Sequence, residues 1–105
     1  MPRKRNTDRQ GQSFTAEIKR AVWNKADIVH GHNPDIQRKD RCGAWINWEK
    51  YGDTTENGNG WEIDHIRPVS AGGDDDLSNL QPLQWQNNRA KGDDYPAWNY
   101  CEVRT

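Results

Sequence analysis

Four polar side chains in the second half of the chain have the chemistry needed to hold a metal ion and to move a proton. Asp64 and Asn88 offer oxygen ligands of the hard type that Mg²⁺ and Mn²⁺ prefer, with water in the remaining positions. His65 has an imidazole, the side chain that most often acts as a general base near neutral pH. Asn79 offers an amide oxygen that can accept from one imidazole N–H and so fix the tautomer. These residue types together indicate metal-assisted hydrolysis of a phosphodiester.

Three basic side chains lie close to these groups in the sequence. Arg67 follows His65 by two residues, and Arg89 and Lys91 lie one and three residues after Asn88. Guanidinium and ammonium groups bind phosphate oxygens through charge-assisted hydrogen bonds. We therefore predict that Arg67, Arg89 and Lys91 bind the phosphates of the substrate.

A strand is expected to carry Asp64 and His65. Residues 61–66 alternate between apolar and polar side chains and are followed by Pro68, which is typical of a strand ended by proline. Because successive side chains of a strand point to opposite faces, Asp64 and His65 reach one site only if the strand twists or ends there. Glu62 shares a face with Asp64, either as an exposed charge or as a support for the site.

The segment after this strand predicts a loop, a second strand and a short helix. Residues 74–76 are three aspartates without the spaced ligands of a calcium loop, so we expect a solvated turn that faces away from the strand. Residues 80–83 predict a second strand, at the edge of a sheet because of Pro82. Residues 84–91 predict a helix closed by Gly92.

The first half of the chain predicts a basic arm, a helix and a region that is harder to assign. Residues 1–12 are basic, polar and without periodicity, so they predict a flexible arm, which is either a solvated tail or a segment that binds phosphate. Apolar residues then recur at helical spacing from Ser13 to Gly31, with Ser13 as the expected cap. Residues 41–43 indicate a tight turn, and residues 44–51 fit a strand or a short helix equally. A loop is expected over residues 52–60.

Composition and charge narrow the class of protein. The chain has 105 residues, enough for one small domain, and its few aliphatic side chains are accompanied by six Trp, so we expect an aromatic core. No apolar run approaches the ~18 residues of a membrane span, which predicts no membrane partner. The net charge is −1, which argues mildly against a nucleic-acid partner. Residues 1–45 nevertheless carry +5 and residues 46–105 carry −6, so the first half has the charge of a segment that binds a polyanion.

Two cysteines, Cys42 and Cys101, are too few for a disulfide scaffold. Their number fits a reducing compartment, so we expect free thiols and a cytoplasmic protein.

The spacing of the chemical residues resembles that of the HNH endonuclease family. Asp64-His65 is followed by Asn79 after fourteen residues, by Asn88 after twenty-three and by Lys91 three further on. The surrounding text, DHIRPVSAGG, NLQPL and NNRAKG, looks like that family as well. The likeness covers residues 61–92 closely.

The resemblance implies a small single α+β domain over residues 13–105, with a ββα-metal core at about 61–92, an N-terminal helix and aromatic-rich packing. By that analogy His65 is the general base and Asn79 orients it, while Asp64 and Asn88 bind one divalent cation, Mg²⁺ first and Mn²⁺, Ni²⁺ or Zn²⁺ as alternatives. The function implied is metal-dependent cleavage of DNA, double-stranded in the first instance, with the arm and the helix after Ser13 on its backbone.

Many members of the family hold a structural zinc with two Cys-x-x-Cys pairs, and this chain departs from that pattern. The corresponding positions are Cys42 with Trp45 and Gln84 with Asn87. Since three of the four ligands are missing, we predict no structural zinc. We expect packing of tryptophans to replace it, and the residues concerned are Trp45, Trp48, Trp61 and Trp85.

Two other functions remain open from the sequence. The first is a DNA- or protein-binding module that has the same fold but no turnover. The second is a nuclease toxin domain that is neutralised by an immunity protein.

Overall fold

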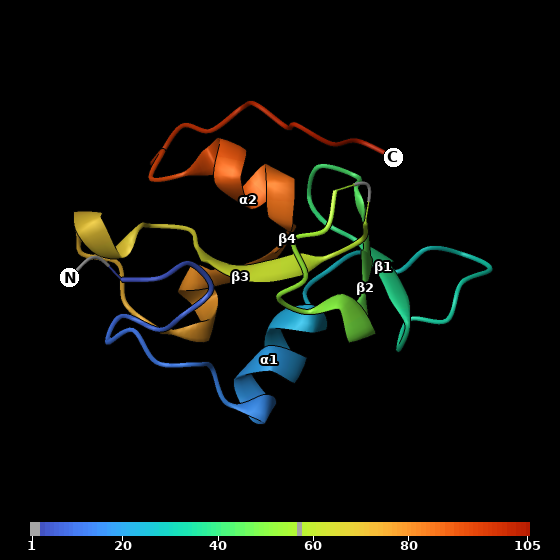
Figure 1. Cartoon of the computed structure of the whole chain (residues 1–105), viewed down its shortest axis with the longest axis horizontal. Helices are drawn as coiled ribbons and strands as arrows, with labels where there is room; N and C mark the ends of the chain where they lie inside the picture. Colours follow the sequence, from blue (N-terminus) through green and yellow to red (C-terminus); the bar gives the residue numbers. More distant parts are fainter. Residues whose placement is uncertain (1–2, 57) are drawn as a thin grey trace.

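The centre of the fold is a two-stranded antiparallel sheet with one helix against each face (Figure 1). β3 (Trp61–His65) pairs with β4 (Leu80–Gln84). α2 (Trp85–Lys91) follows β4 directly and packs on one face, and α1 (Ala16–Trp23) contacts β4 from the other. The α+β architecture and its central ββα unit are confirmed.

A second small sheet and three 3₁₀ turns complete the structure. β1 (Gln37–Lys39) pairs with β2 (Trp45–Asn47) in an antiparallel ladder. The 3₁₀ turns are Trp48–Lys50, Val69–Ala71 and Leu77–Asn79. This computed structural model describes residues 3–56 and 58–105, so positions 1 and 2 of the predicted arm and position 57 of the predicted loop lie outside it.

The elements of the second half lie within one residue of the predictions, whereas the predicted long helix is wrong. α1 starts after Thr15, whose hydroxyl accepts from Ile18 N at 3.2 Å, so Thr15 and not Ser13 is the cap. It ends at Asn24 rather than at Gly31 because the chain then joins the small sheet: Asp27 exchanges two backbone hydrogen bonds with Lys39, of 2.8 and 3.0 Å. This pairing overrides the helical spacing of the sequence.

The region whose pattern did not choose between strand and helix contains both. Residues 45–47 form β2 and residues 48–50 form a 3₁₀ turn. The preceding turn has Gly43 at φ +82°, a backbone conformation that glycine adopts without steric cost.

Both faces of β3 are covered, and this explains why all five of its residues are buried. Trp61 and Ile63 belong to the core cluster that includes Trp23 of α1, whereas Glu62 and Asp64 contact side chains of α2. The polar side chains of β3 are therefore held in a protein environment instead of in water.

The core is aromatic, although not with the predicted set of tryptophans. Trp23 and Trp61 are fully buried with ring centroids 5.2 Å apart, and Trp48 and Tyr51 pack against them. Burial raises the pKa of Tyr51 to about 12, so its phenol is neutral. Trp45 and Trp85 lie outside this cluster: the first packs on His32, and the second donates to Thr55 O at 3.2 Å.

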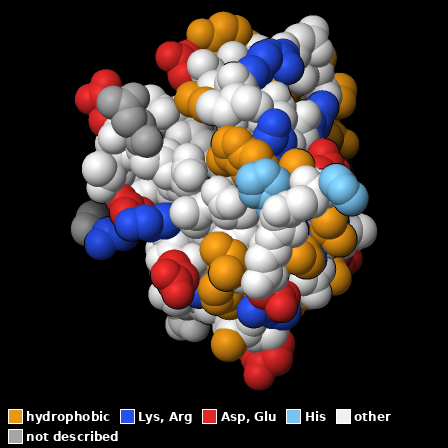
Figure 2. Space-filling view, turned by 90° about the vertical axis from the view of Figure 1, so that its right-hand side faces the viewer, with side chains coloured by type: hydrophobic (Ala, Val, Ile, Leu, Met, Phe, Trp, Pro, Cys, Tyr) orange, Lys and Arg blue, Asp and Glu red, His pale blue; other side chains and the backbone are white. Residues whose placement is uncertain are grey.

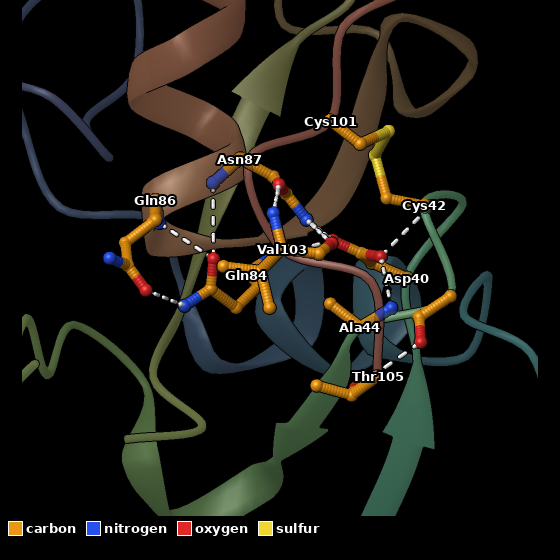
Figure 3. Close-up of a disulfide and its surroundings, with 10 residues drawn as sticks. Asp40, Cys42, Ala44, Gln84, Gln86, Asn87, Cys101, Val103 and Thr105 are labelled. Carbon is orange, nitrogen blue, oxygen red and sulfur yellow. Dashed lines mark hydrogen bonds between the residues drawn. A yellow bond between two sulfur atoms is a disulfide. The ribbon is translucent and has the colours of Figure 1, made fainter. Parts of the chain in front are cut away.

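Cys42 and Cys101 form a disulfide, so the prediction of free thiols is wrong (Figure 3). The bond joins the turn between β1 and β2 to the C-terminal segment, which crosses α2 (Figure 1). The same segment continues to Val103, whose N–H donates to Asn87 Oδ1 at 2.7 Å and whose carbonyl accepts from Asn87 Nδ2 at 2.9 Å. The disulfide and these hydrogen bonds hold the end of the chain on the domain.

A buried carboxylate, that of Asp40, organises the region around Cys42, Gln84 and Asn87. Asp40 is 1% exposed, and its two oxygens accept from the N–H groups of Cys42 and Ala44 and from Gln84 N and Asn87 Nδ2, at 2.9 to 3.1 Å (Figure 3). The Gln84 side chain caps α2 by accepting from the two N–H groups that follow it in the helix. By accepting these hydrogen bonds, the Asp40 carboxylate connects the end of β1, the turn before β2 and the start of α2.

The surface at the β1–β2 end mixes apolar and charged side chains (Figure 2). Ile28 and Ile36 are exposed beside this sheet. Isolated apolar side chains of this kind are ordinary on the surface of a folded domain. Among the described residues, no helix is long and apolar enough to cross a membrane.

Candidate active site

A pocket of about 540 Å³ opens beside the end of β3. Asp64 and His65 line it from the strand and Asn88 lines it from α2, so three of the four predicted chemical side chains meet there. Three residues of the N-terminal arm, Arg3, Arg5 and Asn6, also line the pocket.

The imidazole of His65 is held by a carboxylate that sequence reasoning missed. His65 is 4% exposed, and its Nε2 lies 2.7 Å from Asp75 Oδ1. A carboxylate only accepts, so Nε2 carries the proton and Nδ1 is left as the acceptor. Phe14 packs on the ring with centroids 6.0 Å apart. This arrangement orients the imidazole and leaves Nδ1 without a hydrogen-bond partner among the described residues.

The prediction that residues 74–76 face away from the strand is wrong for Asp75. The register of the sheet explains why: His65 pairs with Leu80, so the intervening loop leaves and returns at the same point. An acidic residue in that loop is therefore brought back to His65. The sequence signal for this contact is the expected pairing of the two strands, because it brings both ends of the loop, and so the aspartates within it, close to His65.

The Asn79 side chain lies on the backbone of this loop. Its Oδ1 accepts from Arg67 N at 2.8 Å, and its Nδ2 donates to Arg67 O at 3.1 Å and to Asp74 O at 2.9 Å. The hydrogen-bond partners of the Asn79 side chain are thus the backbone groups of Arg67 and Asp74. The partner of the His65 imidazole is Asp75. Asn79 fixes the loop shape on which the position of Asp75 depends.

Asp64 is buried between Gln81 and Lys91. Gln81 Nε2 donates to Asp64 Oδ2 at 2.9 Å, and Lys91 Nζ lies 3.3 Å from the same oxygen. Burial raises the pKa of the Asp64 carboxyl, and the two donors oppose that shift only in part. A desolvated carboxylate at the wall of a pocket is a group whose charge a cation would stabilise.

Asn88 is oriented by Glu62, the residue for which two readings were open. The two side chains are buried, and Asn88 Nδ2 donates to Glu62 Oε1 at 2.9 Å. Since the amide nitrogen is engaged, Asn88 Oδ1 is the free end of the side chain, with no hydrogen-bond donor among the residues that the structure describes. Glu62 is a support for the site rather than an exposed charge.

The three predicted phosphate-binding cations do not gather at one place. Lys91 is 3% exposed and contacts Asp64 and the His65 carbonyl, the latter at 3.1 Å. Arg67 donates through Nε to Ala71 O at 2.8 Å, and the guanidinium of Arg89 stacks on Trp85 at 4.9 Å from the ring centroid. The arginines that do line the pocket belong to the N-terminal arm.

The donor set at the pocket fits a hard divalent cation. Among residues 3–56 and 58–105, no group of three or more His, Cys, Asp or Glu side chains is arranged as a metal site. Asp64 and Asn88 instead supply one carboxylate and one amide oxygen at the open pocket, and ions such as Mg²⁺ commonly use one or two protein oxygens and keep several waters.

Comparison with known proteins agrees with this geometry. The family model described as HNH endonuclease matches residues 40–94, which contain β2, both strands of the central sheet and α2. Searches among curated proteins and among solved structures return no significant match. The match spans more than half of the chain and includes Asp64, His65 and Asn88 of the pocket. This chain therefore belongs to the HNH endonuclease family.

Proposed function

We propose that this protein is a metal-dependent endonuclease that hydrolyses phosphodiester bonds of DNA. Membership in the HNH endonuclease family supports nuclease activity in general. The observation that carries the specific proposal is the His65–Asp75 hydrogen bond of 2.7 Å at a pocket that also receives Asp64 and Asn88. An oriented imidazole and two hard oxygen ligands in one pocket are the parts that hydrolysis of a phosphodiester requires.

His65 is the general base in this proposal. With Nε2 donating to Asp75, Nδ1 accepts a proton from a water molecule, and the resulting hydroxide attacks phosphorus. The bond from phosphorus to the 3′ oxygen breaks, which yields a 5′-phosphate and a 3′-alkoxide, and the alkoxide takes a proton from solvent water to become the 3′-hydroxyl. Asp75 stabilises the imidazolium that forms, because the carboxylate is already on the opposite nitrogen.

Asp64 and Asn88 are the proposed ligands of the cation. A divalent ion held there supplies neutralisation of the phosphate charge and of the charge that develops on the 3′ oxygen. Gln81 and Lys91 hold the carboxylate of Asp64, and Glu62 turns the oxygen of Asn88 outward. The ligands are thereby positioned before the ion binds.

Plasmid cleavage tests the proposal. We expect the wild type to nick or linearise supercoiled DNA with Mg²⁺ or Mn²⁺, and EDTA or His65→Ala to abolish the reaction. His30→Ala removes an exposed histidine outside the pocket and is the matched control. Cleavage that survives His65→Ala would contradict the role of His65, and cleavage in EDTA would contradict the need for a metal.

A panel of nucleic-acid substrates and metal ions tests which substrate and which cation the protein uses. Supercoiled, linear and single-stranded DNA and RNA are each incubated with Mg²⁺, Mn²⁺, Ni²⁺ and Zn²⁺. We expect double-stranded DNA to be cleaved. A protein that binds DNA but cleaves nothing with any of the four ions would instead be a binding module with the nuclease fold.

A further inference from the structure

The N-terminal arm is attached to the open edge of β3. The N–H of Ile63 points away from β4 and donates to Asn6 Oδ1 at 2.7 Å. Asn6 has φ +59°, a conformation that asparagine tolerates better than most residues, and the chain turns there. A side chain of the arm thus satisfies a backbone donor of the catalytic strand.

A second attachment joins the arm to the residue that orients His65. Arg9 N donates to both oxygens of Asp75, at 3.1 and 3.3 Å. The turn that presents Arg9 is closed by Asp8, whose carboxylate accepts from Gln10 N and Gln12 N at 2.9 Å each. These contacts place the arm beside the pocket.

This path brings two cations to the pocket wall. Arg3 and Arg5 line the pocket together with Asp64 and His65, and so do Val69 and Ser70 of the 3₁₀ turn Val69–Ala71. The guanidinium of Arg3 is used within the arm, where Nη1 donates to Thr7 O at 2.7 Å. Among the described residues, Arg5 has no side-chain hydrogen bond and no ion pair within 4.0 Å.

We propose that residues 3–9 form a strap over the active-site pocket in which Arg5, and not its neighbour Lys4, contacts a phosphate of the nucleic-acid strand and Asn6 positions Arg5. This inference rests on the proposed nuclease function and adds a substrate contact to it. A planar guanidinium presents paired donors that match two phosphate oxygens, and Arg5 is an arm cation at the pocket whose guanidinium contacts no acceptor within the described part of the chain.

Binding without catalysis tests the contact. The affinity for a labelled double-stranded oligonucleotide is measured by fluorescence anisotropy in EDTA over a series of salt concentrations. We expect Arg5→Gln to weaken binding about tenfold and to reduce the slope of log K against log salt by about one phosphate contact. Lys4→Gln removes the same charge from the neighbouring residue, which does not line the pocket, and we expect it to change affinity by less than about threefold.

Equal losses for Arg5→Gln and Lys4→Gln would overturn the proposal, because the arm would then act only through its overall charge. No loss for Arg5→Gln would overturn it directly.

A double-mutant cycle tests the positioning role of Asn6. Asn6→Gly keeps the backbone conformation and removes the oxygen that binds Ile63 N. We expect Asn6→Gly to weaken binding in the wild type and to have little further effect when Arg5→Gln is present. Additive losses would overturn the role of Asn6 as a positioning residue, since the two side chains would then act independently.

The proposal and the nuclease function can fail separately. Cleavage by the wild type with an unchanged KM in Arg5→Gln overturns the strap and leaves the nuclease function intact. A wild type that never cleaves, but whose binding depends on Arg5 and not on Lys4, overturns the nuclease function and supports the strap.

Discussion

Asp75 holds the imidazole of His65 from the loop that joins β3 to β4, with the carboxylate Oδ1 2.7 Å from Nε2. The same carboxylate accepts from Arg9 N in the N-terminal arm. Asp75 is thus the point at which the strand, the loop and the arm meet. Its negative charge lies beside the nitrogen that must remain protonated if His65 is to act as a base at Nδ1.

Asp75→Asn is expected to lower kcat about 10- to 100-fold, the usual effect of removing a partner that orients a reacting group. The amide nitrogen can donate to Nε2, which places the ring proton on Nδ1, and a neutral amide no longer stabilises the imidazolium that forms when Nδ1 acts as the base. Cleavage assays give the loss in rate, and ¹⁵N spectra of the imidazole report the tautomer.

Asp76→Asn is the matched control for this variant, since it removes the same charge from the next, exposed residue. Asp76→Asn should keep both the rate and the tautomer of the wild type. A normal rate in Asp75→Asn would show that Asp75 does not position His65.

Local sequence patterns predicted the elements whose formation depends mainly on residues close together in the sequence. The alternation in 61–66 and the helical segment closed by Gly92 predicted β3 and α2 within one residue, because turn and strand preferences there agree with the packing. The same patterns failed for residues 24–31, where helical spacing lost to pairing between Asp27 and Lys39. Propensity is a weak signal when a long-range ladder competes with it.

The long-range contacts of the site were beyond any local pattern. Cys42 and Cys101 are separated by 59 residues, and nothing in their spacing shows that the end of the chain returns across α2. No periodicity in residues 1–12 links the arm to the domain, so the hydrogen bond between Asn6 and Ile63, 57 residues away, could not be predicted. Asp75 and Arg5 were missed for the same reason: each acts through a contact that exists only after the sheet has formed.

Lys91 is expected to stabilise the fold through Asp64. Its ammonium lies 3.3 Å from a buried carboxylate, and Lys91→Met leaves that charge without its cation. Removing one partner of a buried ion pair costs about 3 kcal/mol or more. Urea denaturation in EDTA measures the free energy of unfolding, and Lys50→Met, which alters an exposed lysine, should change it by less than about 0.5 kcal/mol.

The loss in Lys91→Met should depend on pH. Burial already raises the pKa of Asp64, so the folded protein holds that proton more tightly than the unfolded chain does. The corresponding stability is complete below the ordinary pKa of aspartate and is lost as pH rises through the raised value. Without Lys91 the pKa rises further, so the deficit relative to the wild type should be larger at about pH 7 than at about pH 4. A deficit that is equal at both pH values would contradict the pairing with Asp64.

The Cys42–Cys101 disulfide is expected to stabilise the domain by about 2–4 kcal/mol, because it restricts a long loop of the unfolded chain. Urea denaturation of the wild type should therefore shift to lower urea in dithiothreitol. The double variant Cys42→Ser, Cys101→Ser is the control, since its transition should be the same with and without the reductant. Two reactive thiols in the untreated protein would contradict the bond.

Gly73 should tolerate alanine far less well than Gly72, although both belong to the loop that carries Asp75. A Cβ on Gly73 would overlap the carbonyl oxygen of Arg67, and Gly73 N donates to Pro68 O at 2.8 Å, so the loop must open to make room. Gly72 has φ +88°, and its Cβ would meet only the end of the flexible Arg67 side chain, at 3.4 Å. Gly72→Ala should cost about 1 kcal/mol of strain.

We expect Gly73→Ala to cost more stability than Gly72→Ala and to reduce cleavage as well, because opening the loop moves Asp75 away from His65. Urea denaturation and plasmid cleavage of the two variants measure both effects. Equal losses in the two variants would mean that the close approach of Gly73 to Arg67 does not determine the shape of the loop, and that Asp75 reaches His65 without it.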